Sequence, residues 1–99
     1  MRIESSAPTR IDLAGGTYDI WPLYLFHDRA QTLNVALGIR ARCVLSSRRD
    51  YRISITSDDT GEQIEVEDLA DLPTDQLPLV TRLVRQFGAR GVDIRTASE

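Results

Sequence analysis

Residues 9–22, TRIDLAGGTYDIWP, include the side chains of this sequence whose types and spacing could do chemistry. An alternating stretch ends at two glycines, Gly15 and Gly16, and Asp19 follows three residues later. Glycine has no Cβ, so its backbone N–H groups can approach a bound molecule closely and its φ angle can be positive. The pattern predicts a turn that holds a small ligand, although the glycine pair alone also suits an ordinary tight turn.

Asp19 could hold the hydroxyl groups of a sugar. An ionised carboxylate offers only acceptors, so it can bind two neighbouring hydroxyls at once. The same side chain could instead cap the short segment IWPLY that follows it. Thr17 could bind a hydroxyl or simply close the turn. Tyr18 and Trp21 could stack on a sugar ring or be buried beside Leu23 and Phe26. Sugar binding and a purely structural turn both fit these residues.

The residues before the glycines predict a strand. Ile11 and Leu13 alternate with Arg10 and Asp12, which places Arg10 on the polar side of that strand. Three later runs alternate in the same way and are separated by the turn sequences SSRRD and DDTG, at residues 32–45, 51–55 and 64–66. The first of these three runs reads as a long half-buried strand. Together the three runs predict antiparallel strands.

One helix is predicted between these strands and a last one. Four apolar residues recur at helical spacing, namely Val80, Leu83, Val84 and Phe87. Asp75 could cap the start of the helix, Pro78 suits its first turn and Gly88 suits its end. Alternation then restarts at residues 92–95. The order predicts an α+β fold of antiparallel strands, with the helix packed on one face of the sheet.

The first half of the chain resembles a known family. APTRIDLAGGTYDIWPLY, followed after a short spacer by the alternating TLNVALGIRARC, is similar to the N-terminal signature of the GHMP kinase superfamily. The similarity is greatest to the heptose-phosphate kinase and fucokinase-like branch, which opens with Ala-Pro-x-Arg-Ile, a strand, Ala-Gly-Gly and an aspartate. The resemblance implies a ribosomal protein S5 domain 2-like fold, with which the later strands and the helix are compatible.

The resemblance also implies roles for individual residues. Arg10 becomes the catalytic residue near the acceptor hydroxyl and the transferring phosphoryl group, and Gly15, Gly16, Thr17 and Asp19 become the substrate-binding turn. The galactokinase branch has a Glu-His pair where this chain has Gly16 and Thr17, so galactose is disfavoured as substrate. The heptose branch commonly has a third glycine at the position of Thr17, and this departure leaves the sugar open.

The implied reaction is ATP-dependent phosphoryl transfer to a hydroxyl of a sugar or sugar phosphate, with ATP and Mg²⁺ as cofactors of a full-length enzyme. Such kinases share a glycine- and serine-rich phosphate loop that opens a helix and holds the nucleotide phosphates. Residues 1–99 contain no such loop, which in family order follows a strand like VDIRTASE. We therefore expect residues 1–99 to be the N-terminal part of a GHMP kinase N-terminal domain, without the phosphate loop, the catalytic carboxylate and the C-terminal domain. Alone, this part is expected to be inactive and to bind neither cofactor tightly, and its nucleotide-binding residues are unknown.

The composition of the chain restricts the kinds of partner that it is expected to bind. The net charge is −3, so nucleic acid is not an expected partner. Cys43 is the single cysteine and cannot form an internal disulfide, and His27 has no second histidine or cysteine at metal-ligand spacing, so no metal site is expected. No charged-then-apolar leader precedes Ala7, and the most apolar window, IWPLYLF, is too short to cross a membrane. These features predict a cytoplasmic protein, and the short chain predicts a thin core.

Two other functions fit the same elements. The chain could be a non-catalytic module with an S5-like fold that binds a sugar or a protein. It could also be an RNA-binding S5-like domain, which the acidic balance disfavours. An in-frame glycine- and serine-rich loop downstream of codon 99 would favour the kinase, and a stop codon there would favour the module. The sugar, the hydroxyl that is phosphorylated and the oligomeric state do not follow from the sequence.

Overall fold

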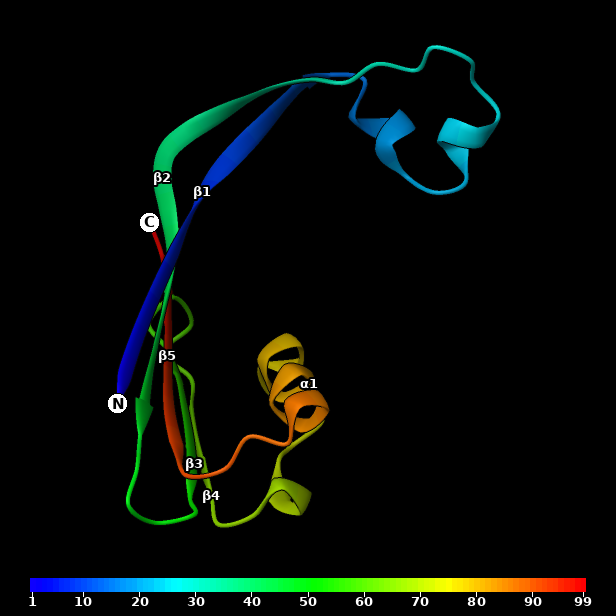
Figure 1. The fold of residues 1–99 in the computed structure, drawn as a ribbon. Helices are drawn as coiled ribbons and strands as arrows, with labels where there is room; N and C mark the ends of the chain where they lie inside the picture. The colour runs from blue at the N-terminus through cyan, green and yellow to red at the C-terminus, as the bar shows by residue number, and fades with distance from the viewer. The chain divides into compact units, whose positions relative to one another are not determined.

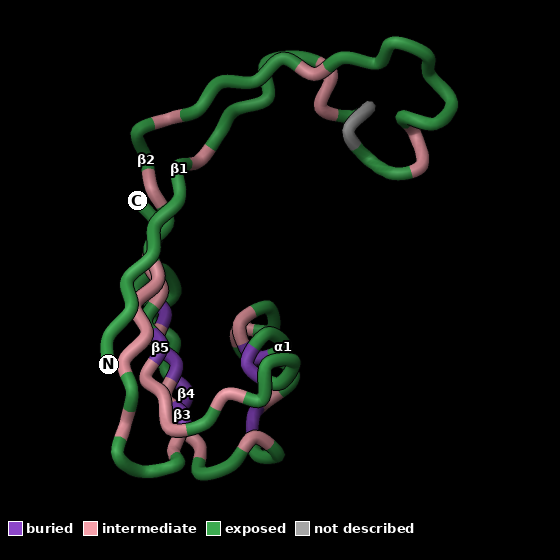
Figure 2. The backbone as a smooth tube through the Cα atoms, viewed as in Figure 1, coloured by how far each residue is buried: buried purple, intermediate pink, exposed green. Residues whose placement is uncertain are grey.

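The computed structural model consists of two compact units, residues 1–7 with 41–99 and residues 8–40. It describes residues 1–17 and 20–99, and Tyr18 and Asp19 are grey in Figure 2. The strands and the α-helix in Figure 1 have these bounds: β1 Arg2–Ala14, β2 Leu33–Ser47, β3 Ile53–Ser57, β4 Gln63–Val66, α1 Pro78–Phe87 and β5 Val92–Ser98. Three short 3-10 helices complete the elements: η1 Gly16–Asp19, η2 Leu23–Leu25 and η3 Leu69–Asp71.

The strands form one five-stranded sheet in the order β1-β2-β5-β3-β4. This confirms the α+β class, but the expectation of antiparallel strands throughout is wrong. β5 lies between β2 and β3, antiparallel to β2 and parallel to β3. Parallel neighbours need a crossover connection, and the segment that contains α1 supplies it between β4 and β5. The sheet is therefore mixed, and the more specific S5 domain 2-like assignment stays a prediction.

The core is built on one row of residues across four strands. Leu45 pairs with Ile94, Ile94 with Ile55, and Ile55 with Ile64, so these four apolar side chains are neighbours on the sheet. Among the described residues, the buried apolar cluster consists of six, Ile53, Ile55, Ile64, Leu72, Val84 and Ile94. These six residues, together with the buried polar residues Ser57 and Thr81, are coloured purple in Figure 2. The thin core expected from the chain length is confirmed.

The backbone conformation of single residues determines where α1 begins and ends. Pro78 occupies the first turn and Gly88, at φ 61°, ends the helix, as the sequence predicts. Asp75, however, is not the cap, because Leu77 occupies that position with a left-handed φ of 42° and gives no side-chain cap. The carbonyl of Leu77 accepts the hydrogen bond of the Thr81 N–H, and the helix starts at Pro78, three residues after Asp75. A left-handed turn at a leucine is rare and leaves no trace in a sequence pattern.

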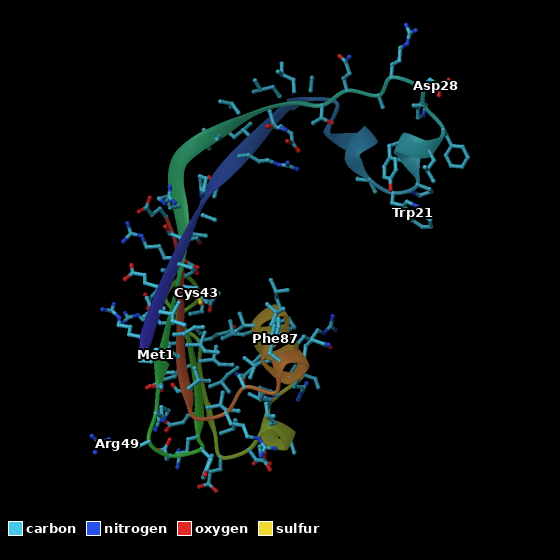
Figure 3. All side chains as sticks on the ribbon, viewed as in Figure 1. Met1, Trp21, Asp28, Cys43, Arg49 and Phe87 are labelled. Carbon is cyan, nitrogen blue, oxygen red and sulfur yellow. The ribbon has the colours of Figure 1, made fainter. Side chains whose placement is uncertain are left out.

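Only part of the apolar stripe of α1 packs on the sheet. Val84 is buried, whereas Leu83 is 48% exposed and Phe87 is 80% exposed (Figure 3). Thr81 is fully buried instead, and its hydroxyl donates to the carbonyl oxygens of Leu77 at 3.1 Å and Pro78 at 3.2 Å. A threonine hydroxyl satisfied by the preceding turn can replace an apolar side chain in the core.

The long strand β2 is half-buried over only part of its length. Leu33, Val35 and Ile39 are exposed, whereas Cys43 and Leu45 are partly buried against the core cluster. Alternation correctly predicted the strand, because it marks the two faces of a strand. It could not show how far a covering layer extends. Cys43 is a free thiol, and partial burial raises its pKa.

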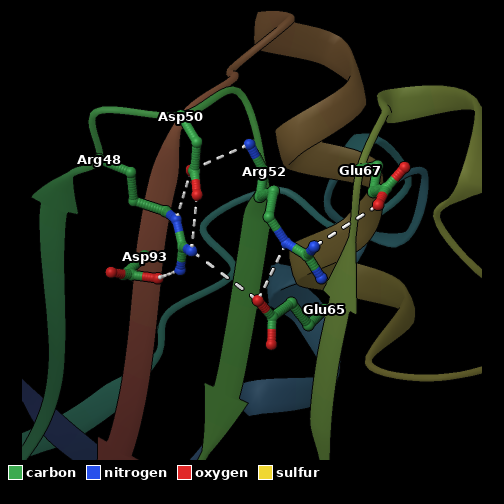
Figure 4. Close-up of polar contacts among 6 residues, drawn as sticks. All are labelled: Arg48, Asp50, Arg52, Glu65, Glu67 and Asp93. Atoms are coloured by element: carbon green, nitrogen blue, oxygen red, sulfur yellow. Dashed lines mark hydrogen bonds and ion pairs between the residues drawn. The ribbon is translucent and has the colours of Figure 1, made fainter.

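A network of ion pairs connects the β2–β3 loop with β4 and β5 (Figure 4). The Arg48 guanidinium lies 2.6 Å from Asp93 in β5, 2.8 Å from Asp50 in the loop and 3.8 Å from Glu65 in β4. Arg52 adds a second contact to Glu65, at 3.1 Å. The network thereby ties the loop to the start of β5.

Among the described residues, no helix has the length and apolarity that a membrane span requires.

We expect Asp50→Asn to weaken the acid sensitivity of the fold. Hydrogen bonds from Arg48 hold the pKa of the Asp50 carboxylate below its usual value near 4. A carboxylate with a lowered folded-state pKa stabilises the fold above its unfolded-state pKa, and this contribution is lost as pH falls through the lowered value. Melting temperatures measured from pH 6 to pH 2.5 should therefore fall less steeply below about pH 4 in the variant.

Asp75→Asn is the control, because Asp75 is exposed and lies outside this network. It should follow the wild-type curve. Equal slopes for Asp50→Asn and the wild type would show that the Arg48–Asp50 contact has no energetic weight in solution.

Candidate functional site

The glycine turn predicted at the end of the first strand is present, and its first glycine is essential to it. Gly15 has a left-handed φ of 78°, which side chains rarely allow. A Cβ at this position would lie 2.0 Å from the carbonyl oxygen of Gln31. The Thr32 hydroxyl donates to the Gly15 carbonyl at 3.1 Å and fixes the same contact from the other side. Only glycine fits position 15.

The second glycine is enclosed by a side chain instead of by backbone. A Cβ on Gly16 would lie 3.1 Å from Asp12 Oδ2 and 3.3 Å from Asp12 Cβ. This spacing is tighter than ordinary van der Waals contact, and a small shift of Asp12 would relieve it. Backbone therefore excludes a side chain at position 15, whereas a side chain at position 16 would displace one carboxylate.

Arg10 lies on the polar side of β1, as predicted, and next to the same carboxylate. Residues two apart on a strand share a face, and Arg10 Nε lies 3.6 Å from Asp12 Oδ1. The Thr9 hydroxyl donates to the Ile39 carbonyl at 3.2 Å and links β1 to β2 beside this pair. The structure thus brings Arg10, Asp12 and Gly16 together. Asp12 was not among the predicted site residues, and its only signal in the sequence is its i, i+2 spacing from Arg10.

Two predicted site residues follow the glycines. Thr17 is exposed in η1, directly after the pair. Tyr18 and Asp19 lie outside the described residues. The role of Asp19 as a sugar ligand and its alternative role as a cap on the next segment therefore both stay predictions, as do the two roles open to Tyr18.

The aromatic segment after the turn is open to solvent. Trp21 is 70% exposed and Phe26 is 75% exposed, and the Trp21 side chain is labelled in Figure 3. The Leu23 N–H donates to the Ile20 carbonyl at 2.7 Å, which folds the segment into a turn of its own. Of the two roles open to Trp21, burial beside Leu23 and Phe26 is wrong. An exposed indole close to the glycine turn in the sequence remains available to a ligand.

These groups together can bind a polar, partly anionic molecule. The turn supplies backbone at close approach, and a guanidinium provides directed donors that suit phosphate oxygens. Among the described residues, no three histidine, cysteine, aspartate or glutamate side chains are arranged so that they could hold a metal ion. The turn backbone and the Arg10 guanidinium are groups of the kind that can hydrogen-bond hydroxyl and phosphate oxygens.

The fold is one that sugar kinases of known structure share, which confirms the resemblance indicated by the first residues. A D-glycero-D-manno-heptose 1-phosphate kinase from Bacteroides thetaiotaomicron superposes with a TM-score of 0.77 over 99% of this chain, at 24% identity. A candidate sugar kinase from Campylobacter jejuni superposes with a TM-score of 0.70 over 98% of this chain, at 27% identity.

The chain spans about a third of the length of each solved neighbour, 34% of the first and 31% of the second. No protein-family model and no curated protein matches it. The likeness therefore concerns the fold of about a third of each solved neighbour.

Proposed function

We propose that residues 1–99 are the N-terminal, substrate-side portion of an ATP-dependent kinase that phosphorylates a hydroxyl of a sugar or sugar phosphate. The observation that carries the proposal is the glycine turn at Gly15 and Gly16, in which backbone excludes a side chain at Gly15, the Asp12 carboxylate crowds Gly16, and Arg10 lies beside Asp12. The shared fold with a heptose 1-phosphate kinase supports it. Heptoses and their phosphates are accordingly the first substrates to test.

Each residue of the turn has a role in this proposal. The backbone of Gly15 and Gly16 approaches the sugar, Thr17 exchanges a hydrogen bond with one hydroxyl, and the Asp19 carboxylate accepts from two. Arg10 stabilises negative charge on the phosphoryl group as it is transferred. ATP supplies that phosphoryl group, with Mg²⁺ bound to its phosphates. The sugar side of such a reaction works by orienting the acceptor hydroxyl, because phosphoryl transfer depends mainly on positioning and electrostatics.

The proposal is tested first on the gene and then on the protein. Sequencing downstream of codon 99 should reveal an in-frame glycine- and serine-rich loop. The full-length protein should release ADP from ATP only when a heptose, a heptose phosphate or a related sugar is added. A stop codon at position 100, or the absence of ADP release with every sugar tested, would favour a non-catalytic binding module instead.

Asp19→Ala in the full-length protein should lower sugar-dependent kcat/KM about tenfold to a hundredfold. The substitution removes charge-assisted hydrogen bonds worth about 1.5 to 3 kcal/mol each. Affinity for ATP should hardly change, because the proposed contact is to the sugar alone. A coupled assay of ADP release, with the sugar and the nucleotide varied separately, measures both quantities.

The matched control is Asp28→Ala, which removes an exposed carboxylate from the same unit, beyond η2. It should leave kcat/KM within about twofold of the wild type. Unchanged sugar kinetics in Asp19→Ala, accompanied by a lower melting temperature, would remove Asp19 from the site and make its role structural.

A further inference from the structure

The Asp12 side chain lies between two groups of the proposed site. Its Oδ1 faces the Arg10 guanidinium, with 3.6 Å between Oδ1 and Nε. Its Oδ2 lies against Gly16, where it would be 3.1 Å from any Cβ. One carboxylate therefore contacts both the cation that the kinase would use and the second glycine of the turn.

We propose that Asp12 is a positioning residue, which holds the Arg10 guanidinium at a fixed place relative to the glycine turn. This inference rests on the proposed function of that turn. Asp12 is well suited to the task because β1 sets the direction of both side chains and because they share one face of the strand. Gly16 completes the arrangement, since the absence of a Cβ there lets the carboxylate lie against the turn.

The effect of this contact should appear in catalysis and not in stability. Both side chains are largely exposed, 57% for Arg10 and 38% for Asp12, and exposed ion pairs add little to the free energy of folding. Orientation is a different quantity, because a small displacement of a catalytic group can slow a reaction by up to about a hundredfold. A fall in kcat at constant melting temperature is thus the signature of the proposed role.

The geometry also predicts that positions 12 and 16 are coupled. In Gly16→Ala the new methyl group would push the Asp12 carboxylate away and displace Arg10 with it. In Asp12→Ala the carboxylate is already gone, and only the 3.3 Å contact to Cβ remains. Gly16→Ala should therefore cost much less in the Asp12→Ala background than in the wild type, because residues in contact are not additive.

The kinetic test uses the full-length protein with ATP and its best sugar. Asp12→Asn should lower kcat about tenfold or more, with the sugar KM within about twofold and the melting temperature unchanged. The kcat of the double variant Asp12→Ala/Gly16→Ala should be at most about twofold lower than that of Gly16→Ala. Three results would overturn the proposal: a raised sugar KM at constant kcat, which indicates direct sugar contact; a melting temperature that falls with kcat; or additive losses in the double variant.

A second measurement tests the Asp12–Arg10 contact and does not require kinase activity. In residues 1–99 the Nε–Hε resonance of Arg10 should move, and its hydrogen should exchange faster with water, in Asp12→Asn. Glu4→Gln is the matched control, because Arg2 and Glu4 form a pair on the same strand, at the same spacing and also at 3.6 Å. It should shift the Arg2 signal and leave that of Arg10 unchanged. If the Arg10 Nε–Hε resonance is unchanged in Asp12→Asn, the proposal is overturned. If that resonance changes but the full-length protein phosphorylates no sugar, only the proposed kinase function is overturned.

Discussion

Gly15→Ala should reduce sugar-dependent kcat/KM of the full-length protein more than a hundredfold. The new Cβ would lie 2.0 Å from the Gln31 carbonyl oxygen, a distance at which no side-chain rotation can help. The backbone must move, and the left-handed φ of 78° adds strain of about 1 to 2 kcal/mol. A displaced turn withdraws the backbone and Thr17 from the sugar together. The loss should exceed that of Gly16→Ala, whose obstacle is a movable carboxylate.

The variant Gly61→Ala distinguishes the effect of backbone strain from the effect of steric overlap by a new Cβ. Gly61 has a similar φ of 70°, but a Cβ there would meet nothing within 4 Å. This variant should lose some stability and keep its sugar kinetics. If Gly15→Ala retained more than about a tenth of wild-type kcat/KM, the turn would not be part of the sugar site.

Gly91→Ala should be the substitution that most strongly destabilises the sheet among the glycines. Its Cβ would lie 2.6 Å from the Asp50 carbonyl oxygen, and its φ is 60°. The Gly91 carbonyl also accepts a hydrogen bond from the Arg48 N–H at 2.8 Å, so the loop cannot retreat without losing it. We expect a loss of about 3 kcal/mol in the free energy of unfolding, measured by urea denaturation.

The same Gly61→Ala variant serves as the control, with a loss of about 1 to 2 kcal/mol from its left-handed backbone alone. Equal losses at the two positions would show that the loop yields freely and that the close approach of Gly91 to Asp50 has no energetic cost.

Most of the elements could be predicted from the sequence, but their order in the sheet could not. Ile53 and Ile55 alternate with polar residues because only one face of β3 is buried, and this periodicity is visible in the chain. The insertion of β5 between β2 and β3 depends on pairings such as Leu45 with Ile94, which no local pattern encodes. A segment of period two looks the same whether its neighbours are parallel or antiparallel.

The candidate site, too, could be predicted from the sequence only in part. Gly15 and Gly16 were found because glycine pairs are distinctive, yet the reason that each is needed lies in contacts to Gln31 and Asp12. Gln31 approaches only after the chain has turned back, so its place follows from the tertiary structure. Asp12 was read as an ordinary polar residue of a strand. Its closeness to Gly16 depends on the path of η1, which the sequence did not indicate.

The central place of β5 has a consequence for the nascent chain. The ribosome releases β2, β3 and β4 before β5, yet in the folded sheet β5 pairs with both β2 and β3. Until it arrives, β2 and β3 each present an unpaired edge, and such edges readily pair with other chains. Pairing Leu45 with Ile94 also closes a long loop, and contacts between distant residues form slowly. Synthesis of this chain therefore passes through an aggregation-prone stage, during which a chaperone that shields strand edges would raise the yield of folded protein.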